Sequence, residues 1–516
     1  MTASGLPVLA ARIGAFTFHG ASAPALREIG LVAVSGTLTA VLGGSGSGKT
    51  ALGKVLAGWL RAGQAGSLNG SLQLGETRLE FVGGEDDPRI DPEAWSRRVG
   101  YVPQDAAAIL SSVRSTVAEE LAFGLENRGM AREQMHSEVA RTAELTGLTA
   151  LLGRDPGTLS GGELRRLAVG CAVISQPEVL VLDEPLASLD AAGAAQIVEL
   201  LRGLLDAGTA VVLLSQAADG LALGAAHWVV LDRGTVSARG TPAHLERSPE
   251  LAGSGVVTTD MSSPAPRRRN MSSRTPGSAA VLELRDIGFG YGSAGIPARR
   301  SASRPAGRSA GNPPRPAVLR GLELAVRPGE IVAVTGPNGA GKSTLLRHFN
   351  GLLRPESGEV LVAGRGIAGI PAGRVSASVG LLFQQPRDQL FERTVLREVS
   401  FGLRRLIGAE AAGIRARAAL AAVGLSGAAE AHPAELPASQ QRLLALATVL
   451  AREPAVLALD EPTVGLDRHG LARLRAAIDS AAARGAGVVL VTHDLEYAQA
   501  HAHRTLELRD GRLREL

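Results

Sequence analysis

The sequence predicts an α/β fold with two similar halves, and three observations lead to this prediction. The stretch Leu159–Asp190 returns at Leu436–Asp467 with a constant offset, 460 − 183 = 277 and 467 − 190 = 277. Each copy contains a short Val- and Leu-rich run that ends in Asp-Glu, as a buried parallel strand would. A Gly-rich segment precedes each copy, between a strand-like run and a helix-like run. Open α/β sheets bind ligands at the carboxyl ends of their strands, so Asp183 and Glu184 are candidates for a ligand site.

Length and cysteine content limit the class of protein. With 516 residues the chain is long enough for two domains, each with its own core. The single Cys171 excludes an internal disulfide and any all-Cys metal site, and it fits a reducing cytosol. We find no apolar run near the roughly 20 residues of a membrane helix. Residues 1–20 do not resemble a secretion signal.

The positive charge is concentrated in one part of the chain. The net charge is +4, which at first suggests nucleic acid. However, Met261–Arg320 holds 11 Arg against Glu283 and Asp286, a local charge of +9, which leaves 4 − 9 = −5 for the remainder. We therefore expect a solvated linker and no nucleic-acid partner; a polyanion or lipid contact by the linker is the alternative.

Composition and pattern place the boundaries. We expect a first domain over 6–240, a Pro/Ser/Arg-rich linker over 241–279 and a second domain over 280–516, with a disordered insertion at 292–317. Apolar runs and turn residues predict strands and helices within the domains. The expected strands are Thr37–Leu42, Val99–Gln104, Glu178–Leu182, Ala210–Ser215, Ile331–Thr335, Val379–Gln384 and Gly487–Thr492, with a hairpin over Trp228–Arg239. The pattern of the first half restarts at Val281–Tyr291. The expected helices are Ala51–Trp59, Ser115–Asn127 and Ala131–Leu152.

The two Gly-rich segments have the form GxxxxGK[ST] between a strand and a helix, which is a P-loop. Glycines let backbone N–H groups surround phosphate oxygens, and the helix N-terminus adds partial positive charge. Lys49 brings a point charge to the β- and γ-phosphates, and Thr50 can ligate Mg²⁺. The alternative, a simple Gly-rich turn, does not account for the strand, the helix and the downstream Asp-Glu. The candidate nucleotide-binding residues are Gly43, Gly44, Ser45, Gly46, Ser47, Gly48, Lys49, Thr50, Gly336, Pro337, Asn338, Gly339, Ala340, Gly341, Lys342, Ser343 and Thr344.

Taken in order, the motifs resemble the ABC ATPase family. A P-loop, a strand-end Gln, an LSGGE-type helix start, a strand-end Asp-Glu, SLD or GLD and a strand-end His or its replacement occur twice. The resemblance covers the chain outside the linker and the insertion. It implies two P-loop ABC ATPase domains, each with a RecA-like core, an antiparallel β subdomain and an α-helical signature subdomain. It also implies a head-to-tail pair, in which each ATP lies between the P-loop of one domain and the signature helix of the other.

The resemblance assigns roles to particular residues. Thr50 and Ser343 would bind Mg²⁺, with Asp183 and Asp460 acting through water, and Gln104 and Gln384 would reach the metal and the attacking water. Glu184 and Glu461 stand where a general base would activate water, and His493 would hold the γ-phosphate. Phe18 and Tyr291 would stack on adenine, although ordinary core aromatics are an alternative for both. The signature residues Ser160, Gly161 and Gly162 would contact the phosphates.

The two halves differ at three places. Gln216 stands where the second half has His493, since 493 − 277 = 216. The second signature reads LPASQ, so Pro437 offers neither a hydroxyl nor a backbone N–H to a phosphate, and Ala438 and Ser439 replace glycines. In a head-to-tail pair these changes all fall in the site of the first P-loop. We expect one hydrolytically competent site, at the second P-loop, and one that binds ATP but turns over slowly.

A narrower resemblance is to the ATPase subunits of energy-coupling-factor (ECF) importers. The segment Phe383–Gly402, FQQPRDQLFERTVLREVSFG, carries it, while the first half has Ala107–Ser111 in place of the DQLF step. The resemblance implies a transmembrane coupling subunit and a substrate-capturing membrane subunit as partners. The chain would then lie at the cytoplasmic face of the cell membrane and power import of a vitamin or transition-metal ion. The fusion of both ATPases favours a thiamine precursor as cargo, and cobalt, nickel, biotin and riboflavin are the alternatives.

Two other functions remain open. A soluble tandem ABC protein acting on the ribosome would also lack membrane spans, but such proteins have a long helical linker, whereas residues 241–279 are broken by Pro and Gly. A DNA-repair ABC ATPase would need a coiled-coil or zinc-binding insertion, and we find neither in the sequence.

Overall fold

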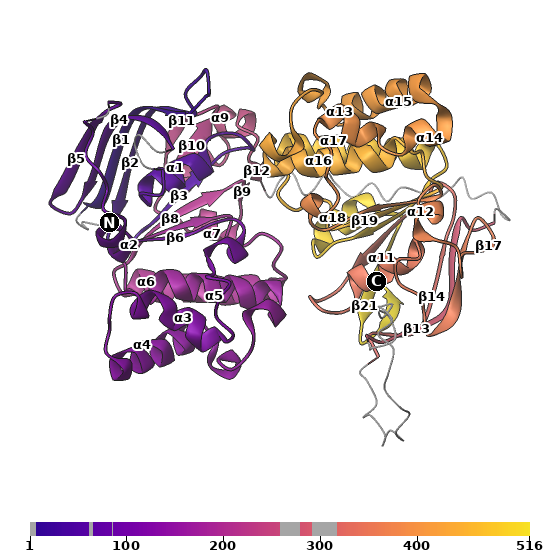
Figure 1. The fold of residues 1–516 in the computed structure, drawn as a ribbon, viewed down its shortest axis with the longest axis horizontal. Helices are drawn as coiled ribbons and strands as arrows, with labels where there is room; N and C mark the ends of the chain where they lie inside the picture. Colours follow the sequence, from indigo (N-terminus) through magenta and orange to yellow (C-terminus); the bar gives the residue numbers. More distant parts are fainter. Residues whose placement is uncertain (1–6, 61–64, 85, 259–278, 292–316) are drawn as a thin grey trace, which may run out of the picture. The chain divides into compact units, whose positions relative to one another are not determined.

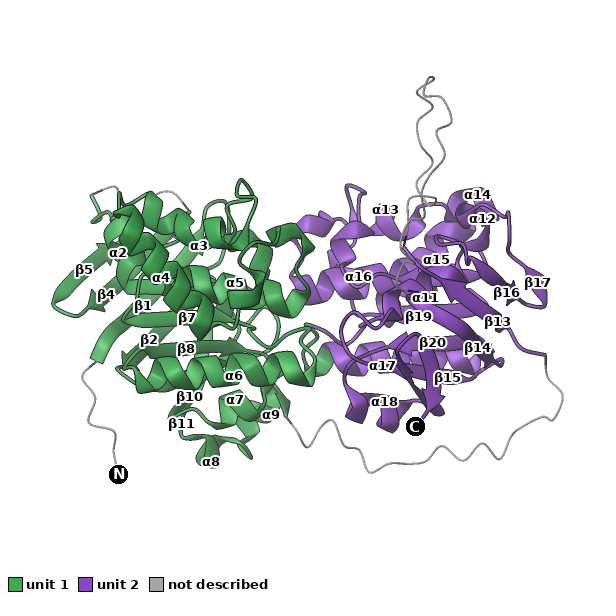
Figure 2. Ribbon diagram, turned by 90° about the horizontal axis from the view of Figure 1, so that it is seen from below, with its two compact units in different colours: residues 1–261, 465–469 green, residues 262–464, 470–516 purple. Residues whose placement is uncertain are grey.

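The computed structural model describes residues 7–60, 65–84, 86–258, 279–291 and 317–516. The chain divides into two compact units (Figure 2): unit 1 comprises residues 1–261 and 465–469, and unit 2 comprises residues 262–464 and 470–516. Across these described ranges, no helix combines the length and the apolar character needed to cross a bilayer. About half of the expected linker, residues 259–278, and nearly all of the expected insertion, residues 292–316, fall outside the described residues.

The core of unit 1 is a six-stranded sheet in the order β11-β10-β3-β8-β7-β6. Strands β10, β3, β8, β7 and β6 are parallel, and β11 pairs antiparallel with β10. Every residue of β3, β7 and β8 is buried, which explains their continuous Val, Leu and Ala sequences. The bounds are β3 Leu38–Leu42, β6 Val99–Val102, β7 Val179–Asp183, β8 Ala210–Ser215, β10 His227–Asp232 and β11 Thr235–Gly240.

A four-stranded antiparallel sheet, in the order β2-β1-β4-β5, forms the second layer of unit 1 (Figure 1). Leu9, Ala11 and Ile13 alternate along β1 with more exposed residues, and they join the core beneath the first sheet. The bounds are β1 Pro7–Phe18, β2 Leu26–Val34, β4 Gly66–Leu74 and β5 Thr77–Val82.

Helices complete unit 1, and local signals explain where the main ones begin. Thr116 and Ser160 each form a capping box, with Glu119 and Glu163 respectively, at the starts of α3 and α5. In Figure 1, α3 and α4 lie beside α5, away from the antiparallel sheet. The helices are α1 Lys49–Leu56, α2 Pro92–Arg98, α3 Val117–Glu126, α4 Arg132–Leu145, α5 Gly161–Val173, α6 Ala191–Asp206 and α7 Gly220–Leu223.

The beginning of the expected linker is folded, which corrects the boundary at residue 241. Residues 242–258 form α8 Pro242–Leu245, α9 Pro249–Gly253 and β12 Val257–Thr258, which pairs with β9 Ala217–Ala218. Leu245, Leu251 and Val256 are buried in the core of unit 1. The prolines misled the interpretation, because each lies in the first turn of a helix, where Pro is tolerated.

Unit 2 repeats this architecture. Its sheet order, β18-β19-β20-β15-β21-β22, matches that of unit 1 strand for strand, and the antiparallel sheet has the order β14-β13-β16-β17. The strands are β13 Leu282–Phe289, β14 Leu319–Val326, β15 Ile331–Thr335, β16 Ser357–Val362, β17 Arg365–Gly366, β18 Val379–Leu382, β19 Val456–Asp460, β20 Gly487–Val491, β21 Arg504–Arg509 and β22 Arg512–Glu515. The helices are α11 Lys342–Phe349, α12 Ala372–Val375, α13 Val395–Ser400, α14 Leu403–Ile407, α15 Ala409–Ala422, α16 Ala438–Leu450, α17 Arg468–Ala483 and α18 Leu495–His501.

Candidate active site

The P-loop of unit 1 connects β3 to α1. Gly48 caps α1 with φ +99°, and a Cβ at this residue would lie 2.8 Å from Leu26 Cδ2, so only glycine fits. The Lys49 ammonium is buried and donates to the carbonyl oxygens of Gly43 (2.6 Å) and Gly44 (2.9 Å). A Cβ at Gly46 would meet no atom within 4 Å. The loop is thus fixed by the Lys49 hydrogen bonds at Gly43 and Gly44, while there is open space next to Gly46.

The strand-end aspartate of unit 1 faces this loop. Thr50 Oγ1 donates to Asp183 Oδ2 at 2.7 Å, and the Tyr101 hydroxyl lies 3.4 Å from the same oxygen. Burial raises the pKa of Asp183 above its ordinary value, although the bond from Thr50 acts in the opposite direction. The structure therefore brings together two of the residues expected to bind Mg²⁺.

Glu184 follows immediately, in a strained and half-buried position. Its backbone has φ 51°, in the left-handed region that non-glycine residues rarely adopt. Burial raises the pKa of its carboxyl from 4.5 to about 7. Within the part of the chain that the structure describes, Glu184 Oε1 and Gln216 Oε1 are buried and have no hydrogen-bond partner. Two buried acceptor oxygens without donors are costly, and the Gln216 amide cannot take up and release a proton as an imidazole would.

Replacing Glu184 by Gln is expected to stabilise unit 1 at alkaline pH. A folded-state pKa of about 7 above an ordinary 4.5 means that the group favours folding below pH 4.5, and that this contribution is lost as the pH rises through 7. At pH 8 the buried carboxylate should cost at most about 3 kcal/mol, at 1.36 kcal/mol per pKa unit.

Chemical denaturation without nucleotide at pH 5 and pH 8 measures this effect. Glu184→Gln should be more stable than the wild type at pH 8 only, and the exposed Glu76→Gln should match the wild type at both pH values. An identical pH dependence in the wild type and Glu184→Gln would contradict the prediction.

The P-loop of unit 2, between β15 and α11, has the same geometry. Gly341 caps α11 with φ +99°, and Lys342 Nζ donates to the carbonyls of Gly336 (2.7 Å) and Pro337 (3.1 Å). The Ser343 side chain is hydrogen-bonded to Asp460, which lowers the pKa of that carboxyl, while burial, the largest effect, raises it. Among the described residues, the buried Asp460 Oδ1 has no hydrogen-bond partner. A free carboxylate oxygen beside a serine hydroxyl is the donor set that Mg²⁺ prefers.

The pair Glu461 and His493 of unit 2 differs from the equivalent pair Glu184 and Gln216 of unit 1 in one side-chain contact. His493 Nδ1 lies 2.9 Å from Glu461 Oε2, and the His493 backbone N–H donates to the same oxygen at 3.3 Å. Burial lowers the pKa of His493, but the bond to Glu461 and its charge outweigh burial, so the pKa lies above its ordinary value. Glu461, with φ 46°, is therefore held by an imidazole as well as a backbone N–H. In unit 1 the backbone N–H of Gln216 bonds to Glu184, but the Gln216 amide oxygen has no partner among the described residues.

Two arginines connect the site to its surroundings, and sequence reasoning missed them. The buried Arg442 guanidinium on α16 donates to the carbonyls of Glu461 (2.9 Å) and Gln384 (3.0 Å). Its counterpart on α5, Arg165, bonds to the Pro103 carbonyl (3.3 Å). The sequence did contain a signal for this pair: both halves have an arginine at the same place in the repeat, since 442 − 277 = 165. Burial lowers the pKa of Arg442 to about 10, so it stays charged at neutral pH.

The glutamines lie at the ends of their strands, where a buried glutamate fixes the following loop. Gln104 is partly exposed and Gln384 is exposed. The Glu398 carboxylate accepts from the backbone N–H groups of Phe391 (2.8 Å) and Glu392 (2.6 Å), and Glu120 accepts from Ser111 in the same way in unit 1. The sequence TV..E contained this signal too, because each glutamate lies four residues after the Thr.

The two candidate adenine-stacking aromatics have similar settings. Phe18 is 40% exposed and Tyr291 is 54% exposed, so each ring has a free face, which ordinary core aromatics would lack. Phe18 packs edge-on against Phe16 (4.9 Å between ring centroids) as Tyr291 does against Phe289 (5.1 Å). The Tyr291 hydroxyl also lies 2.8 Å from Thr344 Oγ1, which fixes the ring beside the P-loop helix.

The signature segments end up in different local structures. Ser160 is exposed at the N-cap of α5, where its Oγ accepts from Glu163 N (3.4 Å) and its N–H donates to Glu163 Oε2 (2.7 Å). Gly161 and Gly162 begin that helix. In α16 the N-cap is Pro437, which has no side-chain cap, and Ser439 is buried.

Comparisons with known proteins agree with this geometry. A family model described as "ABC transporter" matches residues 26–187 and 319–464. A putative ABC transporter ATP-binding protein of Streptomyces coelicolor is 34% identical over 96% of this chain and 91% of its own length. A putative HMP/thiamine import ATP-binding protein of Bacillus subtilis is 27% identical over 96% of this chain and 88% of its own.

A solved structure, cbiO1 from Clostridium perfringens, described as part of an ABC transporter complex, is 28% identical and covers 46% of this chain and 88% of that one, with a TM-score of 0.39. The family model covers more than half of the chain, in both units. The chain therefore belongs to the ABC transporter family, as an ATP-binding protein that hydrolyses ATP and carries two P-loop domains.

Proposed function

We propose that the chain is the fused ATPase of an ECF-type importer. Its partners would be a transmembrane coupling subunit and a substrate-capturing membrane subunit, and it would lie at the cytoplasmic face of the membrane through them. Membership of the ABC transporter family supports ATP hydrolysis as the energy source. The resemblance of the segment Phe383–Gly402 to ECF ATPase subunits supports the type of importer.

The observation that carries this proposal is an exposed aromatic pair next to the Gln384 loop. Phe391 is 65% exposed and packs edge-on against Phe401, which is 50% exposed, with ring centroids 4.7 Å apart. Glu398 fixes the backbone at Phe391, and Leu406, 58% exposed, lies on the next helix of the same subdomain. Large exposed apolar side chains held in a fixed loop are typical of a protein-binding surface. An apolar helix of a membrane partner would cover them.

The equivalent surface of unit 1 is less apolar. Val113 is 75% exposed, and Arg114 lies over the Phe123 ring, 5.2 Å from its centroid. A guanidinium over an aromatic ring stabilises that ring without a partner. We therefore assign the stronger docking contact to unit 2.

The residues of both units fit ATP and Mg²⁺. When bound, Mg²⁺ would neutralise phosphate charge during hydrolysis. Ser343 and Asp460 would hold it in unit 2, and Thr50 and Asp183 in unit 1, with Gln384 and Gln104 nearby. Asp460 Oδ1, buried and unpartnered among the described residues, provides an available ligand oxygen.

The chain's own groups would divide the work of hydrolysis unequally. Glu461 would take a proton from water while His493, bonded to it, orients the carboxylate and faces the γ-phosphate. Glu184 accepts from the backbone N–H of Gln216 but has no imidazole beside it, because residue 216 is Gln. The family resemblance implies a head-to-tail pairing of the two domains. In that pairing the intact signature at Ser160 would complete the Glu461 site. The altered signature at Pro437 would complete the Glu184 site. We propose one competent site and one slow site.

The thiamine import named for the Bacillus subtilis relative supports a thiamine precursor as the cargo. That relative matches nearly the whole of both chains, so both are of the fused type. The cargo would be bound by the substrate-capturing subunit and would not touch this chain.

Purification of the tagged chain from detergent-solubilised native membranes, with mass spectrometry, tests the proposal. We expect two small integral membrane proteins to copurify with the wild type. The double variant Phe391→Ala/Phe401→Ala should lose them, because it removes the apolar surface. The control Val82→Ala, an exposed valine on β5, should retain them.

Copurification of ribosomal proteins, with the chain absent from the membrane fraction, would contradict the importer and favour action on the ribosome. Retention of both membrane proteins by the Phe391→Ala/Phe401→Ala variant would contradict the assigned docking surface while leaving the importer in place.

A further inference from the structure

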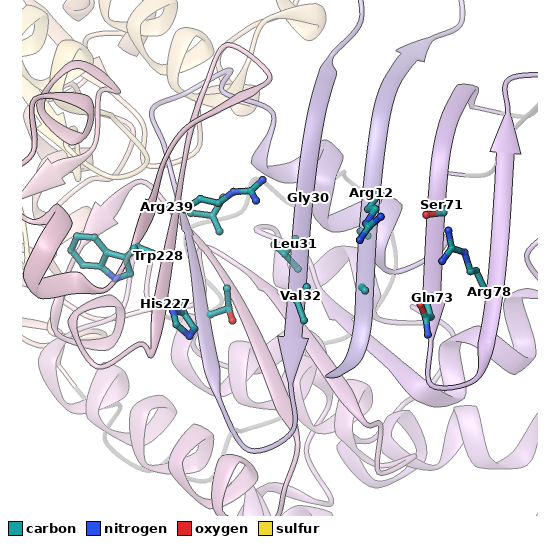
Figure 3. A pocket seen from close by; sticks show the side chains of 15 residues that line it. Arg12, Gly30, Leu31, Val32, Ser71, Gln73, Arg78, His227, Trp228 and Arg239 are labelled. Atoms are coloured by element: carbon teal, nitrogen blue, oxygen red, sulfur yellow. The ribbon is translucent and has the colours of Figure 1, made fainter. Parts of the chain in front are cut away.

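We propose that a cationic groove on unit 1 binds an extended acidic segment of a partner protein. The groove has a volume of about 460 Å³ and lies between the outer face of the antiparallel sheet and the β10–β11 hairpin (Figure 3). Its lining includes no residue of the P-loop, the signature or the strand-end carboxylates.

Three guanidinium groups give the groove its charge, and an imidazole lies beside them. Arg12 on β1, Arg78 on β5, Arg239 on β11 and His227 on β10 line it together (Figure 3). Among the residues that the structure describes, Arg12 and Arg239 have no carboxylate partner. Arg78 is the exception, because it forms an exposed ion pair with Glu80 at 2.6 Å. Two arginines therefore remain available to an anionic ligand.

Small residues let these side chains approach one another. Arg239 lies over Gly30 of β2, since a Cβ on that glycine would be 3.4 Å from the guanidinium Nη2. Gly30 in turn lies opposite Arg12 in the sheet. Any larger side chain at residue 30 would push the Arg239 guanidinium away from the groove floor.

The strand register places the cations in a row across the sheet. Arg12 pairs with Ser71 of β4, and Arg78 pairs with Gln73 of the same strand. With strands about 4.8 Å apart, the row from β2 to β5 spans about 14 Å. A single phosphate is too small to contact both ends. Side chains on one side of an extended peptide repeat about every 6.7 Å, so two or three carboxylates would match this row.

The rest of the lining also favours a peptide over a nucleic acid. Trp228, the aromatic residue of the groove, is fully buried and offers no ring face for base stacking. Val32, 48% exposed, provides an apolar contact for a peptide side chain. Guanidinium groups bind carboxylates through two parallel hydrogen bonds, which suits Asp and Glu.

Unit 2 shows that the fold does not require this charge. At the position of Arg12 it has Arg285, which is neutralised by Glu283 (2.9 Å) and Glu359 (3.1 Å). On the neighbouring strand, Glu359 lies opposite Arg285, whereas the uncharged Ser71 lies opposite Arg12. Glu515 lies opposite Leu506 where Arg239 lies opposite Val229, so the sign of the charge is reversed. At the two positions compared, the uncompensated arginines therefore occur in unit 1 and not in unit 2.

Fluorescence anisotropy with the full-length chain tests the proposal. The probe is a fluorescein-labelled ten-residue peptide of alternating Glu and Ser, and the reference peptide has Gln in place of Glu. The Glu peptide should bind the wild type at least about tenfold more tightly than the Gln peptide, and less tightly as salt is added. The double variant Arg12→Gln/Arg239→Gln should lose at least about tenfold in affinity.

A matched control removes the same charge from unit 2. Arg285→Gln/Arg512→Gln should bind the Glu peptide as the wild type does, and both double variants should keep the wild-type rate of ATP hydrolysis, which shows that they fold. Equal binding of the Glu peptide to both double variants would overturn the proposal. So would equal affinity for the two peptides, or tight binding of a single-stranded RNA decamer through Arg12 and Arg239 without binding of the Glu peptide.

Discussion

Replacing Glu461 by Gln is expected to lower the ATPase rate of the assembled complex by at least about 100-fold, the usual contribution of a general base. Glu184→Gln should keep most of the activity. The reason lies in the geometry of each unit: Glu461 Oε2 is held by His493 at 2.9 Å, whereas Glu184 Oε1 and Gln216 Oε1 have no partners among the described residues.

Steady-state phosphate release from the purified complex measures the difference, with nucleotide binding measured in parallel. Both variants should still bind ATP, because the P-loop contacts of Lys49 and Lys342 are unchanged. His493→Gln makes unit 2 resemble unit 1 at this position. Its ATPase rate should be lower than that of the wild type, as for Glu461→Gln. If Glu184→Gln were the more damaging variant, the competent site would have been assigned to the wrong half.

Replacing Ser160 by Pro is expected to cost about 100-fold in ATPase rate, comparable with the loss of one oxyanion donor. Pro removes both the Oγ that accepts from Glu163 N and the N–H that donates to Glu163 Oε2. The loss of this capping box should also lower the free energy of unfolding of unit 1 by about 1 kcal/mol. Ser160→Ala, which keeps the N–H, separates the two effects.

The reciprocal substitution in the second signature, Pro437→Ser, should have little effect on the ATPase rate. Pro437→Ser provides an N-cap hydroxyl to α16, so it should stabilise unit 2 by about 1 kcal/mol. The total ATPase rate should stay within about twofold, because the other site carries the turnover. Thermal denaturation and phosphate release measure both quantities. A large gain in rate from Pro437→Ser, or no loss from Ser160→Pro, would contradict the assigned roles of the two signatures.

Much of the fold could be predicted because its strands have unambiguous sequences. Ala210–Ser215 and Ile331–Thr335 are strands with the expected bounds, since fully buried parallel strands leave a continuous apolar run. The expected helix at Ala51 begins instead at Lys49, because Gly48 in the left-handed region starts the helix directly. The expected helix over Ala131–Leu152 ends at Leu145, and a short 3₁₀ turn follows.

The rest depends on tertiary contacts that leave no local pattern. The Pro-rich composition of residues 242–258 indicated a linker, but burial of Leu245 and Leu251 against unit 1 decides their structure. Arg442 reads as an ordinary helix residue until the fold brings the Glu461 and Gln384 carbonyls to it. The groove of Arg12 and Arg239 joins residues 227 positions apart in the sequence, so only the sheet register reveals it.

The most direct test of the central claim is a single-turnover measurement on the purified complex. The chain is loaded with ATP, Mg²⁺ is added, and the reaction is quenched at short times to count the ADP formed per chain. One ADP per chain in the fast phase, lost in Glu461→Gln and retained in Glu184→Gln, is the predicted result. Two ADP per chain formed at equal rates would contradict the division into one competent and one slow site.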